Sequence, residues 1–370
     1  MRERAGQSPI WVFSEAMAPH RAAWADLATR ALEPNIFNDP AFALTAAFHL
    51  SGPRRPRFLL AWDPLAPERL IGLCCVAPAT LPLPRSAWLH PQATAAFPLL
   101  DQERAAVALA ALLGRTGLLM HGLPADGPTM RLLADDPRWS IVQVASRSRA
   151  VVRNTPPSLV GKAGKELRRQ SRRMAETGQV AVTVTAAPEG LDAFLRLERQ
   201  GWKGRSRTAL ADTPRLARFV CDMTTALGRE GRCLIHSLTL DDRPVAMGLV
   251  LRSGPHAFFW KTAFDEAYAR FSPGTQLAQA IGQAQAFEPG LCLTDSCAVP
   301  GHSMIDRVWP DRMTVADAFV VPAPRLSVAH RMVLASERAR RTAKTWIKRA
   351  ATIRFAVRGA PGHTANMSGP

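Results

Sequence analysis

The sequence predicts an α/β fold in which mixed central sheets are flanked by helices. Strand-like and helix-like segments alternate along the chain, most clearly between residues 165 and 287. Apolar residues make up 47% of the 370 residues, which is enough to bury a substantial core. A pattern of strand, acidic turn and strand occurs twice, at Leu59–Ala77 and Ile235–Leu251. Either coincidence or two tandem copies of one fold would produce this echo.

The first half of the chain contains the weaker patterns. Strands are expected at Arg57–Trp62 and Leu70–Ala77, on either side of a turn that contains two prolines. Further strands are expected at Leu118–Gly122 and Trp139–Val144. The Ala/Leu-rich segment Gln102–Leu113 is expected to be helical.

The second half is patterned more strongly. Pro214–Leu227, for example, carries Leu216, Phe219, Val220, Met223 and Leu227 on one face of a helix. Helices are also expected at Lys165–Thr177, Leu191–Gln200 and Gly274–Phe287, and strands at Val180–Val184, Cys233–Leu240, Pro244–Leu251, His256–Phe264 and Ala318–Val321.

Prolines mark the expected domain boundaries. The pair Pro156-Pro157 breaks any helix and favours extended backbone before it. A second boundary is expected near Pro322–Pro324, where a Val-rich strand gives way to a basic tail. We therefore expect domains at 1–154 and 155–322, followed by a basic helical tail at 323–370.

Composition restricts the surroundings and partners of the chain. The net charge of +17 predicts attraction to polyanions, but it does not choose among nucleic acid, anionic lipid, an acidic carrier protein and a phosphate-rich cofactor. The six cysteines form no CxxC pair and lie mostly in apolar runs, so we expect reduced thiols and no metal. We see no secretory signal and no transmembrane segment, and we expect a cytoplasmic protein.

The segment from Pro244 to Gly274 carries the most informative local pattern. A buried strand and an aromatic strand are followed by a polar run and then by the start of a helix. Ser272 suits the N-cap and Pro273 the first helical position. The free amides of this first turn and the adjacent Arg270 would bind an anion such as a pyrophosphate. Alternatively, Ser-Pro-Gly is simply how this helix begins.

Several ordered motifs over residues 155–322 resemble one family. The motifs are Trp202-Lys203-Gly204-Arg205, Lys261-Thr262-Ala263-Phe264-Asp265-Glu266, Ser272-Pro273-Gly274, Asp295-Ser296-Cys297-Ala298, His302-Ser303-Met304-Ile305-Asp306 and Trp309-Pro310. They resemble the GNAT-superfamily acetyltransferases associated with bacterial cellulose and exopolysaccharide biosynthesis. That family is distantly related to Fem-type peptidyltransferases, which carry two GNAT-like domains in tandem, and this kinship would explain the repeated hairpin.

The resemblance implies two tandem GNAT-like domains and an acyltransferase activity. An acyl group, most simply acetyl, would move from acyl-CoA to an amine or hydroxyl of a small metabolite or sugar by direct attack. The donor would lie where two central strands splay, near 245–251 and 256–264. Its pyrophosphate would lie at Arg270, Ser272, Pro273 and Gly274. The usual GNAT phosphate pattern, Gln/Arg-x-x-Gly-x-Gly/Ala, is absent here.

Direct attack needs a neutral nucleophile, an oxyanion donor and a route for the proton. Candidate bases are Asp265, Glu266 and Asp295, with His302 as a fourth. Asp265 and Glu266 could instead cap a turn, and Asp295 could orient a backbone amide. Lys261 would stabilise charge or pair with an aspartate. Acceptor-side binding residues are expected among Trp202, Lys203, Arg205 and His302.

Two other functions remain open at this stage. The donor could be aminoacyl-tRNA or an acyl carrier protein, held by the basic helix Lys165–Arg173, which otherwise is only a solvated face. The chain could also be a non-catalytic GNAT-like module in polysaccharide biosynthesis. The tail segment Ser327–Arg349, with Trp346 and Ile347 near its end, could contact an anionic membrane surface or form a frayed tail.

Overall fold

A computed structural model describes residues 9–78, 85–159, 161–323, 327–328, 330–339 and 342 of the chain. The chain forms two compact units, residues 1–324 and 325–370. In the second unit, residue 328 and residues 330–339 are helical. The remainder of the expected tail helix, including Trp346 and Ile347, lies outside the described residues.

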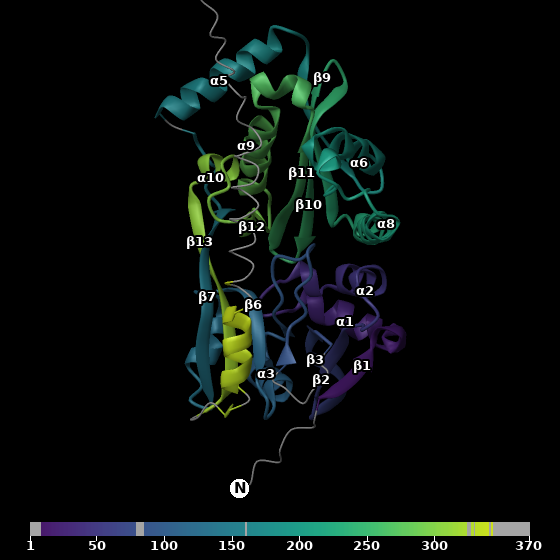
Figure 1. Ribbon diagram of the computed structural model, residues 1–370, viewed down its shortest axis with the longest axis vertical. Helices are drawn as coiled ribbons and strands as arrows, with labels where there is room; N and C mark the ends of the chain where they lie inside the picture. The colour runs from purple at the N-terminus through teal and green to yellow at the C-terminus, as the bar shows by residue number, and fades with distance from the viewer. Residues whose placement is uncertain are drawn as a thin grey trace, which may run out of the picture. The chain divides into compact units, whose positions relative to one another are not determined.

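The first unit contains the same order of elements twice (Figure 1). Each half runs through a strand, two helices, a two-stranded hairpin, a strand, a helix, a strand, a helix and a long last strand. In the first half these are β1 (Ile10–Phe13), α1 (Arg21–Thr29), α2 (Pro40–His49), β2 (Arg57–Asp63), β3 (Ala66–Val76), β5 (Leu99–Leu100), α3 (Ala105–Leu113), β6 (Leu118–Pro124), α4 (Pro128–Ala134) and β7 (Trp139–Val152). In the second half they are β8 (Val180–Ala186), α6 (Leu191–Gln200), α8 (Pro214–Arg229), β9 (Cys233–Leu240), β10 (Arg243–Ser253), β11 (His256–Phe264), α9 (Pro273–Ala286), β12 (Leu293–Asp295), α10 (Ile305–Val308) and β13 (Asp311–Pro322).

The remaining elements lie in the intervals between them. They are η1 (Ser14–Ala16), η2 (Ala18–His20), η3 (Ile36–Asn38), β4 (Arg85–Ser86), α5 (Gly161–Ala175), α7 (Trp202–Arg205) and η4 (Glu266–Phe271). The predicted fold, mixed sheets flanked by helices in a tandem arrangement, is confirmed. The division of the chain at residue 154 stays a prediction.

The long last strands of the two halves exchange places within one sheet. Four strands form a small sheet in the order β1-β2-β3-β5, and nine form the second sheet in the order β4-β6-β13-β7-β12-β11-β10-β9-β8. β13 therefore lies between β6 and β7, both of which belong to the first half. The end of β7 in turn pairs with β12 of the second half, with Val152 opposite Thr294. The halves are thus joined by strand pairing on both sides.

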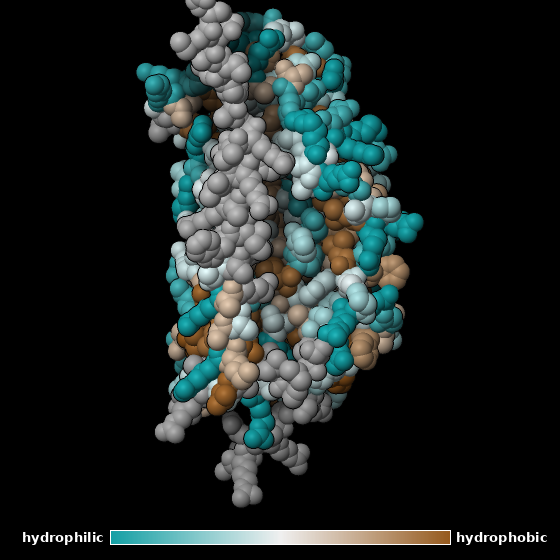
Figure 2. Space-filling view, in the orientation of Figure 1, coloured by the Kyte–Doolittle hydropathy of each residue, from teal (hydrophilic) through white to brown (hydrophobic). Residues whose placement is uncertain are grey.

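Helices cover both faces of the second half of this sheet. On one face, α6 and α8 pack Phe194, Leu197 and Phe219 against the apolar side chains of β9 to β11. On the other face, α9 packs Leu277 and Ile281 against the opposite side chains of the same strands. The hydropathy colouring of Figure 2 shows mostly hydrophilic residues where Figure 1 draws α6 and α8. These helices are therefore amphipathic, as the spacing of their apolar residues predicts.

The splay between central strands lies elsewhere than the sequence predicts. β10 and β11 stay paired along their length, from Ala246 opposite Phe264 to Ser253 opposite His256. β11 and β12 instead run parallel over only three residue pairs, and the last joins Phe258 to Asp295. Beyond this point β11 continues to Phe264, whereas β12 ends. The expected splay between 245–251 and 256–264 is therefore wrong. The observed splay lies between β11 and the three-residue strand β12.

Candidate active site

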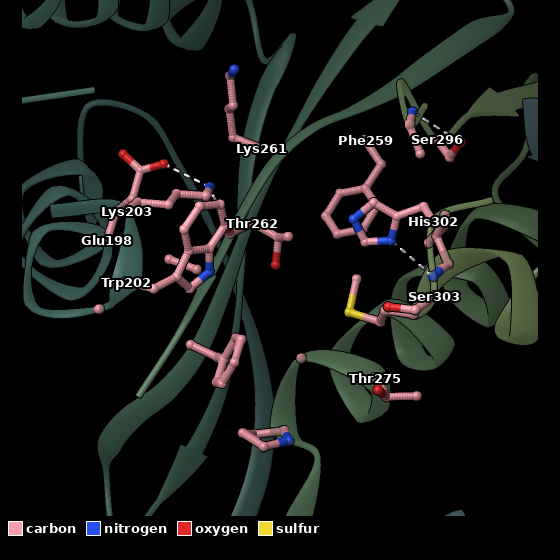
Figure 3. A pocket seen from close by; sticks show the side chains of 18 of the residues that line it. Glu198, Trp202, Lys203, Phe259, Lys261, Thr262, Thr275, Ser296, His302 and Ser303 are labelled. Carbon is pink, nitrogen blue, oxygen red and sulfur yellow. Dashed lines mark hydrogen bonds and ion pairs between the residues drawn. The ribbon is translucent and has the colours of Figure 1, made fainter. Parts of the chain in front are cut away.

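A cavity of about 800 Å³ lies where β11 and β12 diverge. Its walls come from residues 197–203 of α6 and α7, residues 259–264 of β11, Ala269 of η4, residues 272–275 at the start of α9, and residues 296–305 after β12. Figure 3 shows Glu198, Trp202 and Lys203 on one side of the strand that carries Thr262, and Phe259, His302 and Ser303 on the other. The cavity therefore reaches both sides of β11.

An ion pair forms the polar wall on the α6 side. The Lys203 ammonium lies 2.8 Å from a carboxylate oxygen of Glu198, and it donates a second hydrogen bond to the Thr262 carbonyl at 2.7 Å. The other oxygen of Glu198 accepts the Leu210 N–H at 2.7 Å. The Glu198 side chain is only 1% exposed. Because both carboxylate oxygens are engaged, this wall is held in one arrangement.

A β-bulge directs Lys261 into the same region. The register shifts so that Leu249 faces Lys261 and Val250 faces Phe259, which leaves Trp260 as the extra residue of β11. The Lys261 ammonium lies 5.0 Å from the centre of the Trp260 ring. Burial lowers the pKa of Lys261 to about 8, and the nearby Lys203 acts in the same direction.

The start of α9 offers fewer free amides than an ordinary helix N-terminus. Ser272 adopts the left-handed conformation with φ +53°, and its side chain makes no capping hydrogen bond. Its carbonyl accepts the N–H groups of Thr275 and Gln276, at 3.0 and 3.1 Å. Pro273 has no N–H. Within this first turn, Gly274 thus carries the amide that is left to face the cavity.

The structure brings together seven of the twelve residues that the sequence singles out. Those lining the cavity are Trp202, Lys203, Lys261, Ser272, Pro273, Gly274 and His302. Those outside its lining are Arg205, Asp265, Glu266, Arg270 and Asp295. The aromatic, lysine and helix-start positions are thus together, whereas the acidic positions are not.

The acidic residues near η4 have partners of their own. Asp265 caps η4 by accepting the Ala267 N–H at 3.0 Å and pairs with Arg243 at 2.8 Å. Glu266 pairs with Arg205 at 2.7 Å and accepts the Trp202 N–H at 2.6 Å. The Arg205 hydrogen bond lowers the pKa of Glu266. The turn-capping alternative therefore describes Asp265, and Glu266 fixes the backbone at the start of α7.

Asp295 holds the two halves together at the floor of the splay. Its carboxylate lies 2.8 Å from the Arg149 guanidinium of β7, and both side chains are nearly fully buried. The other carboxylate oxygen accepts the Cys297 N–H at 2.8 Å. This bond supports the left-handed backbone of Cys297, whose φ is +54°. Asp295 therefore shapes the cavity wall without lining it.

The remaining predicted residue, Arg270, lies over the Phe271 ring with its guanidinium carbon 4.7 Å from the ring centre. Several lining residues had no predicted role: Glu198, Phe259, Trp260, Thr262, Thr275, Ser296, Cys297, Ser303 and Met304. Ser296, Cys297 and Ser303 lie inside the motifs that carry the family resemblance. Glu198 has no such signal, since only the fold of α6 and α7 brings it to Lys203. Burial raises the pKa of the Cys297 thiol well above its usual range, so this side chain is a neutral thiol.

Comparison with known proteins gives a family match for the stretch from α5 to the end of α9. Residues 161–287 match the family described as acetyltransferase (GNAT) domain. The chain carries a GNAT domain. No curated protein sequence matches the chain.

Solved structures share this GNAT fold over most of the chain. FemX has a TM-score of 0.54 at 11% identity, covering 82% of this chain and 96% of that one. The C-terminal domain of a putative lysylphosphatidylglycerol synthetase from Agrobacterium fabrum has a TM-score of 0.51 at 13% identity, covering 82% and 91%. L-PGS from Bacillus licheniformis has a TM-score of 0.50 at 12% identity, covering 91% and 99%. At these identities the likeness establishes the fold.

The described residues contain no group of three or more His, Cys, Asp or Glu side chains placed to hold a metal ion. They also contain no helix with the length and apolar character needed to cross a membrane.

Proposed function

We propose that this protein is an acyltransferase that moves an acyl group from acyl-CoA to the amine or hydroxyl of a small acceptor. The observation that carries the proposal is the cavity at the divergence of β11 and β12, most of whose lining residues lie in the segment that matches a GNAT domain. This cavity gives access to both sides of β11, so a donor and an acceptor can approach each other across one strand. Direct attack requires the donor and the acceptor to be held next to each other in this way. It proceeds without a covalent intermediate.

The two sides of the cavity suit different partners. The side toward α9 is lined by Phe259, Val299, Met304 and Ile305, and it suits the apolar part of an acyl donor. The side toward α6 carries Trp202 and the Lys203–Glu198 pair, and it suits a polar acceptor. We assign Glu198 and Lys203 to the acceptor side, where Lys203 would orient the nucleophile and the Glu198 carboxylate would take up its proton.

β11 has β10 on one edge and β12 on the other, and its pairing with β12 ends at Phe258. Backbone amides on the β12 edge beyond Phe258 are available to polarise the donor carbonyl, because no strand in the described part of the chain pairs with this stretch of the edge. Lys261 and His302, which the sequence also singles out, are two more polar side chains that line this cavity. We keep both as candidate residues of the active site.

A second donor class is favoured by two observations. The single amide left at Gly274 is a small cradle for a pyrophosphate. α5, which packs against η4 and α9, exposes Lys162, Lys165, Arg168, Arg169, Arg172 and Arg173. A donor carried on a polyanion, namely aminoacyl-tRNA or an acidic acyl carrier protein, would bind such a helix close to the cavity. The name lysylphosphatidylglycerol synthetase likewise describes a protein whose transferred acyl group is an aminoacyl group.

The proposal is tested by measuring the thermal stability of the protein with a panel of acyl-CoAs, with ATP and tRNA as polyanion controls. Turnover is measured separately as the release of free coenzyme A. A ligand at 100 times its dissociation constant adds about 2.7 kcal/mol to the free energy of unfolding. We expect stabilisation by acyl-CoA that persists in moderate salt and is absent with ATP. Equal, salt-sensitive stabilisation by every polyanion would contradict acyl-CoA as donor and favour the carrier-bound donor.

A pair of glycine variants locates the binding site. A Cβ at Gly274 would lie 3.4 Å from the Met304 sulfur and 3.5 Å from the Phe264 ring, so Gly274→Trp places an indole in the cavity. At Gly52 a Cβ meets nothing within 4 Å, which makes Gly52→Trp the matched control. We expect Gly274→Trp to abolish both stabilisation and turnover, and Gly52→Trp to retain them. Full activity of Gly274→Trp would exclude this cavity as the active site.

A further inference from the structure

The cavity contains a positive charge that no side chain of the described residues pairs with. Among the lining side chains, Glu198 carries a negative charge, and Lys203 and Lys261 carry positive charges. Glu198 is already paired with Lys203 at 2.8 Å. Among the described residues, none forms a hydrogen bond or ion pair with the Lys261 ammonium, whose contact is the Trp260 ring at 5.0 Å. Figure 3 shows its amino group pointing away from the Glu198–Lys203 pair.

The other groups near Lys261 cannot serve as counter-ions. Asp295 is bound to Arg149, and the Cys297 thiol is neutral because burial raises its pKa. His90 packs against Trp88 with ring centres 4.6 Å apart. Burial lowers the pKa of His90 to about 4, and Lys261 adds to this effect. A buried charge without a partner is costly, and a ligand that brings the opposite charge removes that cost.

We infer that the acceptor carries an anionic group, a carboxylate or a phosphate, next to the amine or hydroxyl that is acylated, and that Lys261 binds this group. This inference rests on the proposed acyl transfer and specifies its substrate class. Lys203 lies close enough to Lys261 for its charge to lower the pKa of Lys261. In the proposed complex Lys203 would face the nucleophile, and Lys261 would hold the anionic group next to it. An ammonium is a point charge and accepts either anion, so carboxylate and phosphate must be compared directly.

A different role for Lys261, polarising the transferred carbonyl, predicts a different result. If Lys261 acts on the carbonyl, its removal lowers the rate for every acceptor by the same factor. A group that binds the acceptor's anion changes the ratio between acceptors with and without that anion. The ratio of kcat/KM within matched pairs of acceptors therefore separates the two roles.

The experiment uses the full-length chain and two kinds of acceptor pair: α-amino acids with their amides, and phosphoethanolamine with ethanolamine. For the wild type we expect the preferred anionic member to exceed its neutral partner in kcat/KM by about 10- to 100-fold, as for a hydrogen bond to a charged group. We expect Lys261→Met to bring this ratio close to 1, and Lys261→Arg to restore part of it. The pair that shows the preference identifies the anion.

Arg218→Met is the matched control, because it removes an exposed positive charge from α8 and should leave the ratio as in the wild type. Equal use of both members of every pair by the wild type would overturn the inference. So would a loss in Lys261→Met that is the same for both members, since that result assigns Lys261 to the carbonyl.

A binding measurement separates this inference from the proposed function. Thermal stability with each acceptor, without donor, should show stabilisation of the wild type by the anionic member that is lost in Lys261→Met and kept in Arg218→Met. Absence of turnover with any donor would contradict the proposed function while this binding result still decides the role of Lys261. Identical stabilisation of wild type and Lys261→Met would overturn the inference even if acyl transfer is demonstrated.

Discussion

Replacing Asp295 by alanine should destabilise the protein rather than remove a catalytic base. The substitution leaves the Arg149 guanidinium, 4% exposed, without its carboxylate. Removing one partner of a buried ion pair costs about 3–5 kcal/mol. The Cys297 N–H also loses its acceptor, which costs about 1–3 kcal/mol. Arg149 keeps two weaker bonds to Thr94, at 3.2 and 3.3 Å, and these offset part of the loss.

We therefore expect Asp295→Ala to lower the free energy of unfolding by about 4 kcal/mol. Urea unfolding followed by circular dichroism measures this value, and the double variant Arg149→Leu/Asp295→Leu should recover most of it, because no unpaired charge remains. Turnover should persist in Asp295→Ala at temperatures where the protein stays folded. A loss of stability below about 1 kcal/mol, combined with complete loss of turnover, would refute this reasoning and return Asp295 to the role of base.

Three further predictions follow from the described contacts. Burial raises the pKa of Glu33 to about 7, above its unfolded value of 4.5, so its contribution to stability is fully present below pH 4.5 and is lost as pH rises through 7. Glu33→Gln should remove this part of the pH dependence, up to about 3 kcal/mol, in urea unfolding at pH 5 and pH 8; an unchanged slope would contradict the shifted pKa. Pro273→Ala supplies one more amide at the start of α9 and should tighten acyl-CoA binding by up to about tenfold in calorimetry, whereas no change would place the phosphates elsewhere. Lys261 should react with acetic anhydride with a midpoint near pH 8, resolved by mass spectrometry from lysines of α5, and a midpoint near 10.5 would contradict its burial.

Much of the second half could be predicted from sequence because its signals are local. The expected helix Leu191–Gln200 and the expected strands Cys233–Leu240 and His256–Phe264 have the observed bounds. Each depends on the periodicity of apolar residues within a single segment. The start of α9 at Pro273 was also expected within one residue, since proline favours the first helical position.

Features that depend on pairing between distant segments could not be predicted in the same way. β12 contains only three residues, too few for a periodic pattern, and yet its divergence from β11 creates the cavity. Asp295 has the residue type of a base, and only the approach of Arg149 from β7 shows that it is bound in an ion pair. Glu198 enters the site because α7 brings Lys203 back to α6.

The position of β13 determines when the first half can complete its sheet during synthesis. β6 pairs with β13 along one edge, and β13 comprises residues 311–322, whereas β7 ends at residue 152. A ribosome that adds about 5–20 residues per second needs roughly 8–30 s to make the intervening segment. During that interval the nascent β6 and β7 expose strand edges that the finished protein covers. Residues 1–154 expressed alone would keep those edges permanently, so chaperone dependence and aggregation of that fragment follow directly from the exchanged strands.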